Sequence, residues 1–480
     1  MANATVRTPL LAAPLPVEAP VRPPPLMPPT VAEAHVPRGR RVVNLFVRLL
    51  PIVLAGYAMF DRGGAWIHIP GIPLFAGEAM VMLALLVIAG ATGTVLAGAK
   101  SRIPSALLLV FVFWGLLRTL PHVGTYHLDA VRDAALWYYA VFAFVVAGVV
   151  VAMPQLPVQW AAAYRRLLPW LLGWSFVAMQ LDKRLGGPYV PDSPLISWFS
   201  HKSGNTAVNA AIALAFLWLV PIEGMRRRTR VLLTALVSVL VAVSGTQSRS
   251  GMIAAGVAIT VAWLMTWNRR QMVAAMITPV VLVLALAWAI NFQVPATPRP
   301  ISVPQLVKNV ASLTGGGSSE LSDTAQWRDE LWTSLLKETR SSNKLLTGWG
   351  FGPNLAEQMG FAGQKPESPL RSPHNTHLDV LARMGEIGLG IWIALWVAWF
   401  ATMLRSRHRM QAKSQRFARG LMSFAIAGVV AILVNAYFDP TLESPQVALW
   451  LWTLFGLGLG LVARERLARE QQLPASNQTR

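Results

Sequence analysis

The stretch RRRTRVLLTALVSVLVAVSGTQSRSGMIAAGVAITVAWLMTWNRR, residues 226–270, decides the fold. It contains two apolar blocks, 230–246 and 250–267, which are joined by a short polar turn and bounded at both ends by arginines. A helix needs about 20 apolar residues to cross a bilayer, and each block is close to that length. Both sets of arginines lie at the same end of the pair, as in cytoplasmic loops of membrane proteins. The stretch therefore predicts two membrane-spanning helices that turn on the far side of the membrane.

Blocks of the same kind run through most of the 480-residue chain. The chain is 54% hydrophobic and only 13% charged, whereas a soluble domain carries roughly a quarter charged residues. Helices are the expected spanning form, because each satisfies its own backbone hydrogen bonds in lipid and the blocks are too long for barrel strands. We predict an all-α polytopic integral membrane protein of about 12 transmembrane helices, at 43–60, 77–98, 103–118, 134–152, 165–181, 206–221, 230–246, 250–267, 271–291, 385–404, 420–437 and 446–463.

The positions of Lys and Arg test these assignments. If the first helix starts in the cytoplasm, every second connection should be basic. The cations that follow this rule are Lys100, Arg102, Arg165, Arg166, Arg226, Arg227, Arg228, Arg230, Arg269, Arg270, Arg405, Arg407, Arg409, Lys413, Arg416, Arg419, Arg464, Arg466 and Arg469. The opposite connections, such as 61–77, are richer in Gly, Pro and aromatic residues. The pattern predicts an even number of helices with both termini cytoplasmic.

The same clustering decides the meaning of the formal net charge of +20. Proteins that bind nucleic acid gather their cations on a solvent face, but here the cations lie in short segments between apolar blocks. We therefore expect no nucleic-acid partner. The chain has no cysteine, which excludes disulfides, zinc–thiolate sites and thiol catalysis.

The chain divides into membrane parts, tails and one large loop. Residues 1–40 contain ten of the 34 prolines and are predicted to be a disordered cytoplasmic tail. Residues 41–291 hold the first nine predicted helices and 374–463 the last three, with a cytoplasmic tail at 464–480. Residues 292–373 are predicted to form a large periplasmic loop, and loops of such length are usually functional.

The large loop contains one predicted amphipathic helix and ends in a polar segment. The segment Ser322-Asp323-Thr324 is expected to cap this helix, whose apolar residues recur every three or four positions until it ends near Arg340. The loop continues through Gly348-Trp349-Gly350-Phe351-Gly352 and closes with Arg371-Ser372-Pro373-His374-Asn375. Pro373 suits the first position of the next helix with Ser372 as its cap, which places His374 in the first turn.

The closing segment begins the most informative motif: His374-Asn375, nine residues, Gly385, two residues and Gly388. On a helix both glycines share a face with His374 and allow close packing against a neighbouring helix. The motif resembles the signature of the bacterial O-antigen ligases. Its surroundings are also similar to O-antigen polymerases and O-linked protein oligosaccharyltransferases.

Other positions extend the resemblance over about residues 43–463. Arg249 lies in the turn between the helices at 230–246 and 250–267. Arg328 lies on the loop helix, and Asn205 lies just before the helix at 206–221. All three resemble recurrent positions of the superfamily.

The resemblance implies a GT-C-like glycosyltransferase in the bacterial inner membrane, with its active site on the periplasmic side. The implied reaction transfers a glycan from an undecaprenyl-diphosphate-linked donor to a sugar hydroxyl of the lipid A core, with inversion at the anomeric carbon. Membrane lipids are the other expected partners. No cofactor and no metal are expected.

Within this resemblance, His374 is the candidate general base, and Arg249 and Arg328 are candidates to hold the leaving diphosphate. Arginine suits that role, because its planar fork matches phosphate oxygens and it stays charged. The predicted periplasmic loops contain no Asp-x-Asp motif, and no His/carboxylate cluster has metal-ligand spacing. The expected supporting residues are Asn375, Asn205 and Arg371.

Alternatives stay open for both the residues and the function. His374 could cap a helix or lie at the membrane interface, Arg249 could anchor to lipid headgroups, and Arg328 could pair with neighbouring Asp329 or Glu330. A polymerase or a protein O-oligosaccharyltransferase would use the same donor with another acceptor. A secondary transporter is the remoter alternative, because such proteins often contain inverted repeats and no internal repeat is visible in this sequence.

Overall fold

The computed structural model describes residues 39–68, 74–99, 102–185, 189–190, 193–295, 299–312, 319–361 and 371–472. Nearly all of the predicted N-terminal tail lies outside the described residues. The end of the predicted C-terminal tail and the Gly-rich part of the large loop lie outside them as well.

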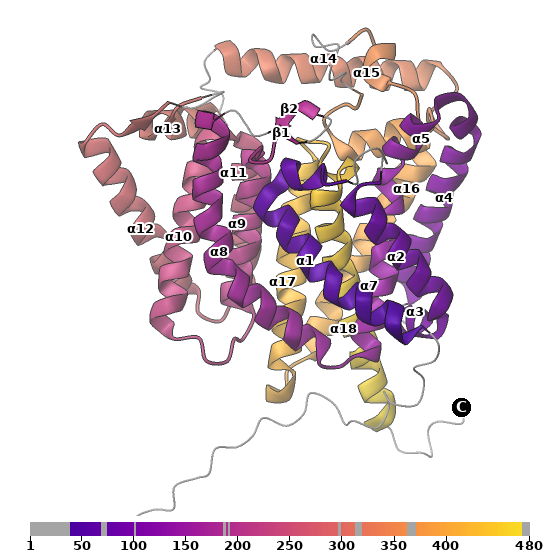
Figure 1. The fold of residues 1–480 in the computed structure, drawn as a ribbon, viewed down its shortest axis with the longest axis horizontal. Helices are drawn as coiled ribbons and strands as arrows, with labels where there is room; N and C mark the ends of the chain where they lie inside the picture. The colour runs from indigo at the N-terminus through magenta and orange to yellow at the C-terminus, as the bar shows by residue number, and fades with distance from the viewer. Residues whose placement is uncertain are drawn as a thin grey trace, which may run out of the picture.

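The described chain is mostly helical, and its long helices run side by side in one bundle (Figure 1). The helices are α1 (Arg40–Ala65), α2 (Ala76–Gly90), α3 (Thr92–Gly98), α4 (Arg102–Tyr126), α5 (Leu128–Asp133), α6 (Ala135–Tyr138), α7 (Val141–Ala152), α8 (Leu156–Leu185), α9 (Ser203–Leu219), α10 (Arg227–Gln247), α11 (Arg249–Met265), α12 (Arg269–Ala289), α13 (Val303–Ala311), α14 (Ser319–Ser341), α15 (Leu355–Gln358), α16 (Thr376–Arg409), α17 (Arg416–Ala436) and α18 (Pro445–Gln472). Each predicted membrane helix overlaps one or more of them, so the all-α prediction is confirmed.

The helices have the length and composition of membrane spans. Among the described residues, eight helices are long and apolar enough to cross a membrane. The bent pair of α2 and α3 would make a ninth, and α9 and α11 are shorter apolar helices. The chain is therefore a multi-pass membrane protein, while its division into twelve spans stays a prediction.

Two predicted helices are interrupted in the structure. The segment 77–98 is bent by 99° between α2 and α3, because Ala91 has a φ of −139° and a ψ of 41°, outside the helical region. The segment predicted at 134–152 is divided between α6 and α7, with the short helix α5 ahead of them from Leu128. Apolar length does not reveal such breaks, since the residues on both sides are equally apolar.

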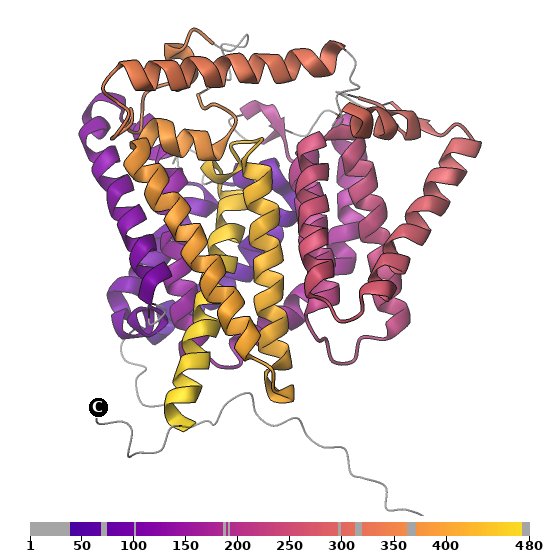
Figure 2. The ribbon, with the colours of Figure 1, turned by 180° about the vertical axis from the view of Figure 1, so that it is seen from behind.

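The centre of the bundle is α18, which packs against α7, α17 and α1 (Figure 2). Large aromatic side chains join it to α16: Trp452 stacks on Trp396 at 5.9 Å between ring centroids, and Phe455 stacks on Trp399 at 5.3 Å. Because lipid tails are as apolar as the side chains, such contacts stabilise helix association in the membrane by close packing and not by removal of surface from water. The cluster gives α16 a firm support below the segment that carries His374.

The large loop lies at one end of the bundle, and α14 crosses that end as a long horizontal helix (Figures 1 and 2). The predicted cap at Ser322-Asp323-Thr324 is wrong, because α14 begins at Ser319 and runs through this segment to Ser341. Glu320 and Leu321 are good helix formers, so the helix extends toward its N-terminus. The predicted end near Arg340 agrees with the structure.

Two small antiparallel sheets lie at the same end (Figure 1). In the first, β1 (Tyr189–Val190) pairs with β2 (Ser193–Ser197). In the second, β3 (Gln293–Val294) pairs with β4 (Ile301–Ser302) ahead of α13. The first sheet forms part of the connection that follows α8, and the second forms part of the connection that follows α12.

Candidate functional site

The loop helix α14 contacts the segment that precedes α16. Trp332 on α14 donates a hydrogen bond from its indole Nε1 to the Pro373 carbonyl oxygen at 2.7 Å. Trp327 on the same helix meets the ring of His374 edge-on, with 6.2 Å between the ring centroids. These contacts hold the large loop over His374 and bring Arg328, the residue after Trp327, close enough for its charge to act on the imidazole.

The backbone at His374 differs from the prediction. The helix α16 begins at Thr376, so His374 lies before the helix rather than in its first turn. The cap is Asn375, whose Oδ1 accepts hydrogen bonds from the N–H groups two and three residues further on, at 3.0 and 3.1 Å. Asparagine is among the best helix caps, and it takes the role expected of Ser372. His374 has a φ of +53°, which is uncommon for a residue other than glycine.

Charged groups surround the partly buried side chain of His374. Burial is the largest influence on its imidazole and lowers the pKa to about 4. The carboxylate of Asp439 acts in the opposite direction and raises this pKa. The cations of Lys202, Arg328 and Arg62 lower it further. The ring is therefore neutral at pH 7 and is able to accept a proton.

His377 lies one helical turn away from His374 in the sequence, but its ring is fully engaged. Its Nδ1 accepts a hydrogen bond from Trp392 at 3.0 Å, and its Nε2 lies 3.1 Å from the Leu433 carbonyl oxygen. The ring of His374 has no hydrogen bond to any of the described residues, and its contacts are with Trp327 and the surrounding charges. Of the two histidines, His374 has the nitrogens available for a substrate.

A polar network lies on the α9 side of His374. Lys202 Nζ forms an ion pair with Asp439 Oδ1 at 2.7 Å. The backbone N–H of Lys202 donates to Asp61 Oδ2 at 2.6 Å, and Asn205 Nδ2 donates to Asp61 Oδ1 at 2.8 Å. Asn435 Nδ2 donates in turn to Asn205 Oδ1 at 3.3 Å. The predicted residue Asn205 is thus a buried link that ties α9 to α1 and α17.

Lys202, Asp439 and Arg62 are site residues that sequence reasoning missed. The sequence carries no clear signal for the ion pair, because Lys202 shares its predicted far-side connection with Lys183 and Arg184, and Asp439 shares its own with Glu443. Those connections are far apart in the chain, and only the packing of α9 beside α17 brings them together. Arg62 is the only Lys or Arg of the predicted far-side connection 61–77, but nothing in the sequence relates that connection to His374.

Arg328 lacks the partners that a surface arginine would have. Its Nε is buried without a hydrogen-bond partner among the described residues. Burial lowers the pKa of Arg328, and the nearby carboxylate of Asp439 raises it. Its neighbour Glu330 accepts a hydrogen bond from Gln326 at 2.9 Å instead of pairing with it. A buried polar group without a partner calls for an explanation, and an anionic ligand would supply one.

Arg249 is the first residue of α11, directly after the cap Ser248, whose Oγ accepts a hydrogen bond from the Gly251 N–H at 3.1 Å. Its NH1 lies 3.5 Å from the Ser312 hydroxyl. The charges of Arg328 and Arg299 both act on Arg249. In the structure the two predicted arginines therefore lie close enough for their charges to interact, and the charge of Arg299 acts on Arg249 as well.

Arg371, a predicted supporting residue, has its guanidinium occupied elsewhere. It forms ion pairs with Asp129 and Asp133 at 3.0 Å each and donates to the Gly352 carbonyl oxygen at 2.6 Å. Asp133 also pairs with the fully buried Arg383 at 3.1 Å. This network ties the large loop to α5 and α16, so the geometry gives Arg371 a positioning role.

The helix α16 is broken at Gly385, which has a φ of +71° and a ψ of −173°. This backbone region is open essentially to glycine alone. A Cβ at Gly385 would lie 2.1 Å from the Leu346 carbonyl oxygen, so the loop also approaches too closely for any side chain. The helix therefore changes direction at the first glycine of the motif, as Figure 2 shows.

The break allows the loop to bond to the backbone of α16. The N–H of Glu386 donates to the Leu345 carbonyl oxygen at 2.8 Å, and the N–H of Trp349 donates to the Ala382 carbonyl oxygen at 2.7 Å. Gly385 thus meets the loop and not the neighbouring helix that was expected. The expected helix contact belongs to Gly388, which faces Trp114 of α4.

Residues 234–393 match the family model described as O-antigen ligase. The match covers about a third of the 480-residue chain and shows a likeness to the O-antigen ligase/polymerase superfamily. The match extends from α10 to the first half of α16 and includes Arg249, Arg328 and His374, whereas Lys202 and Asp439 lie outside it. None of the curated proteins matches the chain.

Proteins of that superfamily are glycosyltransferase-like membrane enzymes of lipopolysaccharide biosynthesis, so the match supports a function of the O-antigen ligase/polymerase type. Within the described parts of the chain, no group of three His, Asp or Glu side chains is placed to hold a metal ion. The cations whose charges act on His374 are Lys202, Arg328 and Arg62.

Proposed function

We propose that this protein is an O-antigen ligase of the inner membrane. It transfers a glycan from an undecaprenyl-diphosphate donor to a sugar hydroxyl of the lipid A core, on the periplasmic side, with inversion and without a metal. The observation that supports this best is that a neutral His374 lies within the electrostatic reach of Arg328 on the loop helix α14, whose buried Nε has no hydrogen-bond partner among the described residues.

The arginines suit the leaving group. As the bond between the anomeric carbon and the diphosphate oxygen breaks, the electron pair stays on the diphosphate, which gains negative charge. Arg328 and Arg249 supply fixed positive charge on the same side of the bundle end, and their mutual repulsion favours an anion between them. A preorganised cation placed where charge develops is an effective form of transition-state stabilisation.

His374 suits the acceptor. A sugar hydroxyl becomes a better nucleophile when its proton is removed during attack, an effect of about 10²–10⁴-fold. The proton passes to a ring nitrogen of His374 while the acceptor oxygen bonds to the anomeric carbon. Inversion follows if His374 and the arginines flank the anomeric carbon from opposite sides.

The donor itself tunes the base. An imidazole with a pKa of about 4 is neutral at pH 7 but is a weak proton acceptor. The diphosphate brings negative charge into the group of cations that lowers this pKa, so donor binding raises the pKa of His374 toward neutrality. The base therefore becomes stronger only when the donor is in place.

Acceptor choice in the purified protein is the test. The full chain in detergent or nanodiscs receives the polyprenyl-diphosphate glycan together with lipid A core, a second copy of the polyprenyl glycan, or a pilin-type peptide. Transfer to lipid A core supports ligase activity. Elongation of the second polyprenyl glycan or glycosylation of the peptide would instead identify a polymerase or a protein oligosaccharyltransferase. Uptake into proteoliposomes that contain the same chain, without any transfer, would indicate a transporter.

The same assay in excess chelator tests the role of the arginines. Transfer should persist, because the leaving-group charge is assigned to Arg249 and Arg328. Loss of transfer that magnesium or manganese restores would show that a metal carries this charge instead.

A further inference from the structure

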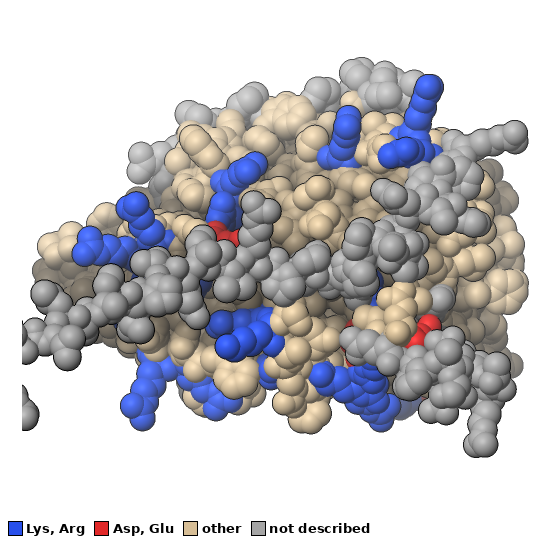
Figure 3. All heavy atoms as spheres, turned by 90° about the horizontal axis from the view of Figure 1, so that it is seen from below, with Lys and Arg blue, Asp and Glu red and all other residues tan. Residues whose placement is uncertain are grey.

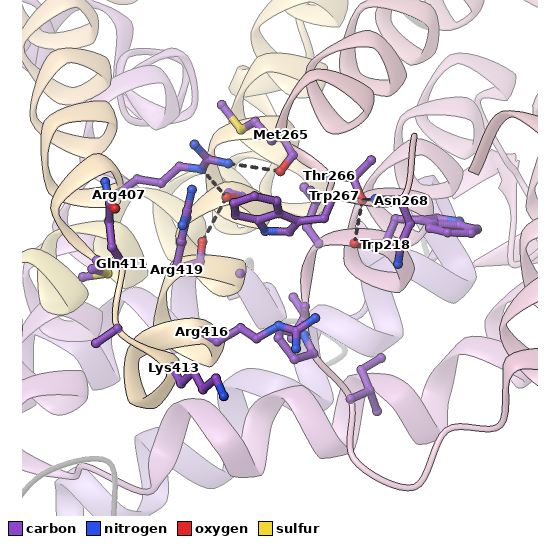
Figure 4. Close-up of a pocket in the computed structure, with 18 of the residues that line it drawn as sticks. Trp218, Met265, Thr266, Trp267, Asn268, Arg407, Gln411, Lys413, Arg416 and Arg419 are labelled. Carbon is purple, nitrogen blue, oxygen red and sulfur yellow. Dashed lines mark hydrogen bonds between the residues drawn. The ribbon is translucent and has the colours of Figure 1, made fainter. Parts of the chain in front are cut away.

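A basic pocket of about 390 Å³ lies at the end of the bundle opposite α14. It opens where α9, α11 and α16 end and where α10 and α17 begin (Figure 4). Figure 3 looks onto this end and shows many Lys and Arg side chains and few acidic ones. The pocket shares no residue with the site around His374, so its role is independent of the proposed function.

The lining of the pocket is strongly cationic. Its charged residues are Arg230, Arg407, Lys413, Arg416 and Arg419, with Glu223 as the one acid among them. No ion pair neutralises these cations within the described residues. The charges of Arg230 and Arg416 repel each other, and so do those of Arg407 and Arg419. The pocket therefore holds like charges together at an electrostatic cost.

Several of these guanidiniums are already positioned. Arg407 donates from Nε to the Ser423 hydroxyl at 2.6 Å and from NH2 to the Met265 carbonyl oxygen at 3.0 Å. Arg419 lies over the ring of Trp267, 4.9 Å from its centroid. Figure 4 shows Arg407, Arg416 and Arg419 on the same side of the pocket as Trp267. A ligand would meet a preorganised set of donors and would lose little affinity to ordering them.

Two of the arginines retain unused donors. The Nε atoms of Arg230 and Arg419 are buried and have no hydrogen-bond partner among the described residues. Buried donors of this kind are normally satisfied.

The chemistry of the lining identifies the anion. Several guanidinium forks around one small space suit a tetrahedral phosphate, which offers more oxygens than a carboxylate. One wall of the pocket is apolar, with Trp218, Leu219, Val220 and Ile222, and Trp267 is 74% exposed beside it. Aromatic residues at helix ends mark the membrane interface, and basic pockets between helices at that depth suit anionic head groups. We propose that this pocket binds the phosphate group of an anionic membrane phospholipid.

The test compares lipids on the purified full chain. Binding of phosphatidylglycerol and of phosphatidylcholine is measured by native mass spectrometry, and inorganic phosphate is tested in parallel as the free form of the same group. The pocket variant is Arg230→Gln with Arg416→Gln. Its matched control is Arg227→Gln with Arg228→Gln, which removes the same charge from the exposed start of α10 outside the pocket lining.

We expect phosphatidylglycerol to bind the wild-type chain more tightly than phosphatidylcholine. The pocket variant should weaken this binding at least about tenfold, the size of one lost hydrogen bond to a charged group, while the control binds as the wild type does. If inorganic phosphate alone displaces the lipid at millimolar concentration, the pocket recognises the phosphate group, but its ligand is soluble phosphate. That outcome would overturn the assignment to a membrane phospholipid. Equal weakening in both variants, or no preference between the lipids, would overturn the proposal, because it would mean that only general surface charge is at work.

Discussion

Trp392 donates a hydrogen bond from its indole Nε1 to Nδ1 of His377 at 3.0 Å. With its Nε2 directed at the Leu433 carbonyl oxygen, His377 has no ring nitrogen left for a substrate. His374 has the opposite character, since its ring is hydrogen-bonded to none of the described residues and lies among the charges of the site. The two histidines therefore differ in whether their ring nitrogens are available to a substrate.

The first prediction tests this difference. His374→Ala should reduce transfer by about 10² or more, the usual range for a general base, while expression, membrane insertion and donor binding remain. His377→Ala should retain most transfer but lower the melting temperature, because it leaves the buried Trp392 indole without an acceptor, at about 1–3 kcal/mol. Transfer assays beside donor-binding and melting measurements check both. A dead His377→Ala variant with an active His374→Ala variant would reverse the assignment.

The second prediction concerns the planar geometry of the two guanidinium groups. Arg328→Lys and Arg249→Lys keep the positive charge but lose the planar fork, so each should fold normally and lose most transfer. The matched control is Arg340→Lys near the end of α14, whose side chain is exposed. Turnover and donor affinity are measured for all three variants. Near-normal turnover in the first two would reduce both arginines to point charges.

The third prediction is a difference between two pH profiles. The free protein holds the pKa of His374 at about 4, and catalysis needs the neutral ring, so kcat/KM should stay level as the pH falls until it approaches that value. In the donor complex the diphosphate raises the pKa, and the acid limb of kcat should lie at higher pH. Steady-state rates between pH 4 and 8 check this. Coincident limbs for kcat and kcat/KM would contradict the proposed effect of the donor.

The fourth prediction tests the break in α16. Gly385→Ala forces a side chain into a backbone region open to glycine and against the Leu346 carbonyl oxygen, which costs at least about 1–3 kcal/mol. It should destabilise the loop contact and abolish transfer. Gly390→Ala is the control on the same helix, because nothing lies within 4 Å of a Cβ there. Melting temperature and transfer are compared, and equal behaviour of the two variants would show that the break is unimportant.

The fifth prediction places the site relative to the membrane. The chain has no cysteine, so single cysteines report without background. Ser341→Cys at the exposed end of α14 should react with a membrane-impermeant maleimide in spheroplasts, whereas Arg228→Cys should not react until the membrane is opened. The reverse pattern would put His374 in the cytoplasm.

The sequence alone was enough for the class of fold. Apolar blocks near 20 residues long, with cations in every second connection, leave few alternatives to a helical membrane protein, because the cost of charges and of unpaired backbone in lipid applies at every position. The same reasoning located the large loop and its helix. It could not show the bend at Ala91 or the break at Gly385. A glycine is compatible with a continuous helix in a sequence pattern, and the backbone that packs against Gly385 comes from the loop at Leu346.

The site was predictable only in part. His374, Arg249 and Arg328 could be singled out by residue type, position in the predicted topology and resemblance to known motifs. The roles of Asn375 as a helix cap and Arg371 as an ion-pair anchor needed the geometry. A hydrogen-bonding side chain looks the same in sequence whether it faces a substrate or a neighbouring backbone.

Only the tertiary structure decided which charges meet. Lys202 and Asp439 are 237 positions apart in the chain, and nothing local in either segment indicates the other. They meet because α9 packs against α17, and that packing depends on the shapes of many apolar side chains together. Local sequence determines what a segment becomes, whereas the environment that sets the pKa of His374 exists only after distant segments have packed.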